Sequence, residues 1–137
     1  MDAANIKDLA KVRYERACEL LEDAKSMLNN DSYKSANNRA YYAAEKAVKA
    51  ALSLAGKDAE THTGVLRTFN MEFIHTPCAY FDRDDMKNLQ SMERIRTSSD
   101  YDDFYVANKA ECEEQVRKAK NLIAKVEAFL IAEGIDL

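Results

Sequence analysis

Apolar residues recur at spacings of three and four along most of the 137-residue chain, with charged residues between them. These spacings bring side chains to one face of an α-helix, so the pattern predicts amphipathic helices that each bury one face. We expect five helices, over residues 5–29, 32–55, 62–74, 82–97 and a last one that starts at Asn108. Because the loops between them are short, the predicted fold is all-α, an up-and-down antiparallel bundle of four to five helices.

Capping residues and helix breakers mark the predicted helix ends. Residues 29–32 read NNDS and interrupt the first apolar stripe, and Asp31 or Ser32 is placed to cap the second helix. Asp82 is placed to cap the fourth. Gly56 follows the second helix as a C′ glycine, and Pro77 breaks the chain before the fourth helix. Asn108 starts the last helix with Glu111 three residues later, which resembles a capping box.

Composition supports one folded domain over residues 1–137. Hydrophobic residues make up 47% of the chain, and it contains only one proline and three glycines. A chain of this length suffices for a single core. The net charge of −4 gives no overall basic field for long nucleic acids, although a local basic cleft remains compatible with it.

The cysteines and the chain start predict a protein of the cytoplasm. Cys18, Cys78 and Cys112 are odd in number and widely spaced, as expected for free thiols in a reducing compartment. The first residues lack the apolar segment of a signal peptide, and no apolar run is long enough to cross a bilayer. We therefore expect no membrane association.

No cofactor or metal motif is present in the sequence. His62 and His75 lack a second histidine or a carboxylate at metal-ligand spacing, so we interpret them as loop or capping residues. Asp100, Asp102 and Asp103 lack the glycine and the distal glutamate of a calcium loop, which favours a solvated acidic loop. The sequence therefore predicts no bound metal and no cofactor.

Two arginines near the end of the fourth helix differ in direction. The apolar stripe of this helix places Arg96 toward the bundle and Arg94 toward solvent. Asp100 would join the side of Arg96 if the helix continued by one turn. A buried arginine is usually paired, so an Arg96–Asp100 ion pair is one interpretation, and a stem that reaches water at the helix end is another.

A second stripe on the second helix lies opposite its alanine face. It consists of Asn38, Tyr42, Glu45 and Lys49. Such a mixture of amide, phenol and charges could line a cleft or contact a partner. Alternatively it is the solvent face, with Glu45 and Lys49 as an i,i+4 ion pair.

Three segments together resemble the HEPN domain family. NRAYYAAEKAVKAAL at 38–52 is similar to the second helix of HEPN domains, and HTGVLRTFNMEFIHT at 62–76 is similar to a stretch of a small prokaryotic subfamily. RTSSDYDDFY at 96–105 resembles the R-x-x-x-D-Y segment of that subfamily. The three occur in the family's order, and the resemblance spans nearly the whole chain.

The resemblance implies a helical bundle that is often a homodimer and is paired with a minimal nucleotidyltransferase in a toxin–antitoxin system. Many HEPN domains are metal-independent ribonucleases with an R-x4-6-H motif, in which arginine holds the phosphate and histidine transfers protons. Counted from Arg96, the histidine window falls on Tyr101, Asp102 and Asp103. Because none of these is a good base for a phosphate substrate at neutral pH, the nuclease mechanism does not carry over.

Three hypotheses follow. The first is a non-catalytic HEPN protein that binds a nucleotidyltransferase and a nucleotide or RNA, with Arg96, Tyr101, Asn38 and Tyr42 as ligand-binding residues. The second is a divergent ribonuclease that uses Arg96 with Asp100 or Tyr101. The third is a structural dimeric scaffold in which Arg96 and Asp100 form an internal ion pair. The missing histidine favours a protein that is not an enzyme.

Overall fold

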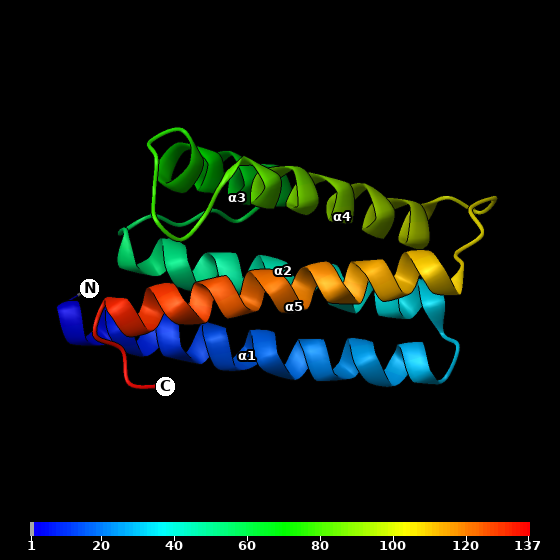
Figure 1. Ribbon diagram of the computed structural model, residues 1–137, viewed down its shortest axis with the longest axis horizontal. Helices are drawn as coiled ribbons and strands as arrows, with labels where there is room; N and C mark the ends of the chain where they lie inside the picture. The colour runs from blue at the N-terminus through cyan, green and yellow to red at the C-terminus, as the bar shows by residue number, and fades with distance from the viewer. Residues whose placement is uncertain (1) are drawn as a thin grey trace.

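Helices account for all the regular structure of residues 2–137, which a computed structural model describes (Figure 1). The elements are α1 (Ala3–Asn29), α2 (Tyr33–Leu54), α3 (His62–Phe69), the π-helical turn η1 (Asn70–Ile74), α4 (Arg83–Tyr101) and α5 (Lys109–Ala132). The four long helices α1, α2, α4 and α5 alternate in direction, and the two chain ends lie at the same end of the bundle (Figure 1). The predicted all-α up-and-down bundle is confirmed.

Helix α2 is the central element of the bundle. It packs against α1, α5, α4 and α3, and its inner face is built from alanines. Small side chains let neighbouring helices approach closely, which explains how one helix can contact four others. The alanines with no exposed surface on α2 are Ala36, Ala40, Ala43, Ala44, Ala47, Ala50 and Ala51.

Several helix ends agree with the expected caps. Asp82 and Asp85 form a reciprocal capping box at the start of α4, and the Asn108 side chain accepts a hydrogen bond from the Glu111 amide at the start of α5. Gly56 follows α2 with a φ of 70°, a left-handed conformation that favours glycine. The Ser32 side chain, by contrast, makes no capping hydrogen bond at the start of α2.

Two of the expected helices differ from the structure at their ends. The third helix has the expected extent, but its last five residues are π-helical. The fourth helix was expected to end at residue 97 and instead continues to Tyr101, so the expected loop over residues 98–101 is wrong. Ser98, Ser99 and Asp100 favour turns on their own, and contacts with α2 hold the extra turn.

A buried polar layer fixes α4 against α2 and α5. The Asn37 amide donates to the Ser99 hydroxyl at 3.2 Å, and the Gln115 amide donates to the Met92 carbonyl at 2.9 Å. All three polar side chains are buried. Since a buried polar group that loses its partner is costly, these hydrogen bonds set the rotation of α4 about its axis. That rotation turns Arg96 toward α2.

Candidate functional site

Arg96 lies on the buried side of α4, in its second-last turn, and only 6% of its side chain is exposed. Arg94, two residues earlier, is exposed. Both directions agree with the helical phase that the sequence predicts. The residues around the Arg96 guanidinium form a group that we call the Arg96 cluster: Arg96, Glu93, Asp100, Tyr41, Tyr42 and Tyr101.

Two carboxylates of α4 itself hold the guanidinium. Nη1 of Arg96 donates to Asp100 at 3.3 Å, and Nη2 donates to Glu93 at 3.4 Å. Burial works to lower the pKa of Arg96, but the hydrogen bond to Asp100 and the charge of Glu93 act in the opposite direction and raise it above its ordinary value. The guanidinium therefore stays charged and is neutralised within one helix.

Asp100 also ties α4 to α2. The Asn38 amide donates to both carboxylate oxygens of Asp100, at 3.0 and 2.8 Å. Asn38, one of the predicted ligand-binding residues, is thus engaged within the bundle. Asp100 consequently has two partners, and it accounts for the additional turn of α4 together with the Asn37–Ser99 hydrogen bond.

Three tyrosine rings enclose the guanidinium. Its carbon lies 5.7 Å from the ring centres of Tyr41 and Tyr42 and 5.9 Å from that of Tyr101. At these distances the rings attract the cation through their π-electron faces. Nε of Arg96 is buried and has no hydrogen-bond partner among residues 2–137. The structure thus brings Arg96, Asp100, Tyr101, Asn38 and Tyr42 together; whether they bind a ligand stays a prediction.

His62 lies beside the Arg96 cluster, although the sequence did not identify it as a residue of the site. Its ring centre lies 5.5 Å from that of Tyr41 and 5.6 Å from that of Tyr42. Nδ1 of His62 pairs with the Glu45 carboxylate, which also accepts a hydrogen bond from the Tyr41 hydroxyl at 3.0 Å. Burial, followed by the Glu45 charge, raises the pKa of Tyr41, so its hydroxyl remains a donor.

This pairing corrects two expectations. His62 is not the capping residue of α3, because the Thr61 side chain caps that helix. Glu45 forms its ion pair with His62 and not with Lys49 four residues on. The two partners are 17 residues apart and meet only when α3 packs on α2, which no local spacing reports. Only the HTGV segment of the family resemblance could have drawn attention to His62.

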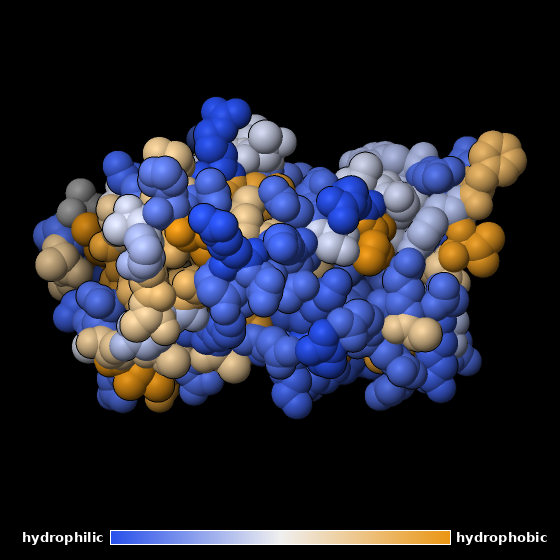
Figure 2. Space-filling model, turned by 45° about the horizontal axis from the view of Figure 1, so that its top comes forward, coloured by the Kyte–Doolittle hydropathy of each residue, from blue (hydrophilic) through white to orange (hydrophobic). Residues whose placement is uncertain are grey.

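The exposed end of α4 and the following loop carry large apolar side chains. We call this surface the α4 tip, and it consists of Tyr101, Phe104 and Val106, which are 74%, 94% and 81% exposed. Figure 2 shows apolar side chains that project from a mainly hydrophilic surface at the right-hand end, where α4 passes into α5. Exposed apolar groups gathered in this way mark a contact surface.

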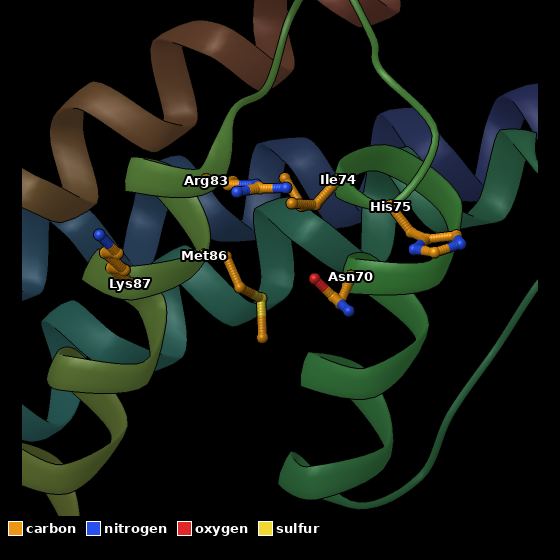
Figure 3. Close-up of a pocket in the computed structure, with 6 residues that line it drawn as sticks. All are labelled: Asn70, Ile74, His75, Arg83, Met86 and Lys87. Atoms are coloured by element: carbon orange, nitrogen blue, oxygen red, sulfur yellow. The ribbon is translucent and has the colours of Figure 1, made fainter.

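A separate hollow of about 340 Å³ lies between η1 and the start of α4 (Figure 3). Its lining includes His75, Arg83 and Lys87, all of which are exposed. Figure 3 shows the His75 ring and the Lys87 side chain pointing away from one another. These basic groups therefore do not converge on one ligand position, and the hollow is not part of the Arg96 cluster.

Within residues 2–137, no three or more His, Cys, Asp or Glu side chains gather as metal ligands would. Likewise, no helix of this stretch is both long and apolar enough for a membrane span.

Comparison with known proteins places this architecture in a family. The chain is 33% identical over 115 residues to a UPF0332 protein of Thermotoga maritima, a match that covers 84% of this chain and 86% of that protein. It is 30% identical over 121 residues to a Methanocaldococcus jannaschii protein named "Putative toxin MJ0142", covering 88% of this chain and 81% of that one.

A solved structure has the same fold. The crystal structure of TT1696 from Thermus thermophilus matches with a TM-score of 0.72 at 24% identity, covering 87% of this chain and 96% of that chain. At this identity the match supports the fold alone. The HEPN domain family itself matches residues 10–129, from within α1 to the last turn of α5. The chain therefore belongs to the HEPN domain family.

Proposed function

We propose that this chain is a non-catalytic HEPN protein of a toxin–antitoxin-type pair, and that it acts by binding a protein partner. The observation that carries this proposal is the state of Arg96. Two carboxylates neutralise it and three tyrosines enclose it. An arginine that stabilises a phosphate in catalysis must reach that phosphate, whereas this one is committed to bracing α4.

The α4 tip is the proposed docking surface, and the partner is a minimal nucleotidyltransferase. Phe104 is almost fully exposed, which is unusual for a large apolar side chain unless it meets a partner. Asp102 and Asp103 border it, so the complementary surface would combine an apolar pocket with lysines or arginines. The resemblance to HEPN domains implies a partner of this class, and the Methanocaldococcus jannaschii relative named "Putative toxin MJ0142" supports a toxin–antitoxin-type pair.

Co-purification tests the docking surface. The chain is co-expressed with a minimal nucleotidyltransferase from the same genome, and the complex is isolated through a tag on one partner. Phe104→Asp should abolish the complex, while Val12→Asp, at a 60% exposed apolar position of α1, should leave it intact. A complex that withstands Phe104→Asp, or its absence for the unaltered chain, would refute the proposal.

We further propose that the chain binds a nucleotide or RNA next to the Arg96 cluster and forms a homodimer. Tyr42 and Tyr101 offer aromatic faces on which a base can stack, and Asn38 and Arg96 border them. Titration with nucleotides and sedimentation of the isolated chain check these two points. A monomer at high concentration would exclude the homodimer.

A metal-independent ribonuclease is the second candidate, because His62 pairs with Glu45 beside the rings that contact Arg96. Glu45 at Nδ1 leaves Nε2 of His62 to take the proton of an attacking 2′-hydroxyl group. In this mechanism His62 replaces Asp100 and Tyr101, the partners of Arg96 expected from the sequence. RNA cleavage in the presence of EDTA that is lost in His62→Ala would favour it. Equal activity in both proteins would remove it.

A further inference from the structure

A line of three hollows follows one face of α2 past the Arg96 cluster. They have volumes of about 480, 270 and 360 Å³. Lys34 and Ser35 line both the first and the second, and Arg39 lines both the second and the third. The shared residues make the hollows one continuous surface, which we call the α2 groove. Its main side chains are Lys34, Ser35, Asn38, Arg39, Tyr42, Lys46 and, from α1, Arg16.

The groove is basic in a protein that is acidic overall. Helix α2 contains four basic residues and a single acidic one, Glu45, although the whole chain has a net charge of −4. Lys34, Arg39 and Lys46 all line the groove; Arg39 and Lys46, seven residues apart, share one edge of it, and Lys34 lies at the other edge. From Lys34 to Lys46 the helix rises by about 18 Å, so the cations form a track and not a single point.

These cations are not neutralised within the chain. Over residues 2–137 no carboxylate lies within ion-pair distance of Lys34, Arg39 or Lys46, whereas Arg16 pairs with Glu19 at 2.9 Å. Partial burial, followed by the nearby positive charges of Lys49 and of α1, lowers the pKa of Lys46. Positive charges that crowd one another favour an anionic ligand.

Three carboxylates line the groove; Asp31 accepts a hydrogen bond from the Tyr33 hydroxyl at 3.0 Å, and the other two are engaged within the bundle. Glu45 is held by His62 and Tyr41, and Asp100 is held by Arg96 and Asn38. Glu45 and Asp100 therefore repel an anionic ligand less than free carboxylates would. Tyr42 lies between the cations, and it lines the same hollow as Arg39 and Lys46.

We propose that the α2 groove binds the sugar–phosphate backbone of single-stranded RNA, with phosphates on Lys34, Arg39 and Lys46 and a base against Tyr42. Alternating cations and aromatic rings along a groove are how proteins hold single strands without reading their sequence. The proposal rests on the proposed RNA ligand and extends the ligand site from Arg96 along α2. An acidic peptide offers the charges without the bases, so Tyr42 favours RNA.

Fluorescence anisotropy with a labelled oligouridine of about twelve nucleotides tests the groove. Each phosphate contact with a single strand contributes a slope of about −0.7 to log K against log salt. The double variant Arg39→Gln/Lys46→Gln should therefore bind roughly 25-fold more weakly at about 0.1 M salt, with a slope shallower by about 1.4. The matched control, Arg94→Gln/Lys120→Gln, removes two exposed cations on α4 and α5 and should bind within about twofold of the unaltered chain.

The outcomes separate this proposal from the proposed function. If RNA binds and the groove variant matches the control, the groove is wrong while the RNA ligand stands. If the unaltered chain binds no oligouridine even at low salt, both RNA proposals fail, while docking at the α4 tip is judged by the co-purification of the Phe104→Asp variant. If polyglutamate displaces the RNA as well as unlabelled oligouridine does, the groove is a surface for acidic proteins. Circular dichroism of each variant verifies that it is folded.

Discussion

Replacing Arg96 by methionine removes the cation of the Arg96 cluster and keeps an unbranched side chain as long as the arginine stem. Glu93 and Asp100 then lose the group that neutralises them, and three tyrosines lose their cation. We expect the variant to fold, because the alanine core of α2 is untouched, but to be less stable.

The magnitude follows from how much water reaches the two carboxylates. Loss of one partner from a fully buried ion pair costs about 3–5 kcal/mol. The side chains of Glu93 and Asp100 keep 25% and 26% of their surface exposed, so water partly screens the charges that remain. With the lost guanidinium–ring contacts included, we expect Arg96→Met to cost about 2–3 kcal/mol. For a chain of this size that lowers Tm by roughly 5–10 °C.

Urea denaturation measures the effect, and two further variants assign its cause. The transition midpoint should fall while its slope is unchanged. Arg94→Met, on the exposed side of α4, should change the free energy of unfolding by less than about 0.5 kcal/mol. Adding Asp100→Asn to Arg96→Met should cost about 1 kcal/mol less than the sum of the two single changes. If Arg96→Met is as stable as the unaltered chain, Arg96 does not brace α4.

Three smaller predictions concern other parts of the fold. Burial raises the pKa of Cys112 to about 11, so alkylation at neutral pH followed by mass spectrometry should label Cys18 and Cys78 first; equal labelling would contradict this. The backbone amide of Asp85 lowers the pKa of Asp82, so Asp82→Ala should cost about 1 kcal/mol at pH 7. Because that pKa is lowered on folding, this difference should shrink as pH falls below about 4, and a constant difference would refute the cap. Ala47→Leu should overpack the α2 core and cost about 1–3 kcal/mol in urea, and no loss would contradict the tight packing.

Helical periodicity was enough to predict the bundle and the direction of Arg96. A stripe of apolar residues fixes which side of a helix is buried, and Arg96 falls within that side whatever the neighbouring helices are. The same phase predicted that Asp100 would join Arg96 if α4 continued. The inward direction of one arginine was therefore readable from α4 alone.

The end of α4 and the role of His62 depend on contacts across the fold. Asn37 and Asn38 hold Ser99 and Asp100 from 62 residues away, and they keep a Ser-Ser-Asp segment helical against its local preference. His62 meets Glu45 only because α3 packs on α2. Such pairs leave no trace in spacing or composition, so the carboxylate beside this histidine could not be foreseen.

The basic character of the α2 groove could be predicted only in part from the sequence. The shared side of Arg39 and Lys46 on their helix, and the number of cations around them, can be read from the sequence. The sequence does not show whether carboxylates of other helices neutralise these cations, because that depends on which residues face α2 after folding. The net charge of −4 also concealed the imbalance, since it averages a basic helix with acidic segments that lie between and beyond the helices.

The affinity of Arg96→Met for the proposed nucleotidyltransferase partner tests the proposed function most directly. This affinity depends both on the support that Arg96 gives to α4 and on the docking surface at the α4 tip. Calorimetric titration is performed at a temperature at which the variant is folded, with Arg94→Met as the control. We predict at least tenfold weaker binding for Arg96→Met, because α4 no longer holds the α4 tip in place, and unchanged binding for the control. Equal affinity of Arg96→Met and the unaltered chain would show that the brace does not support docking.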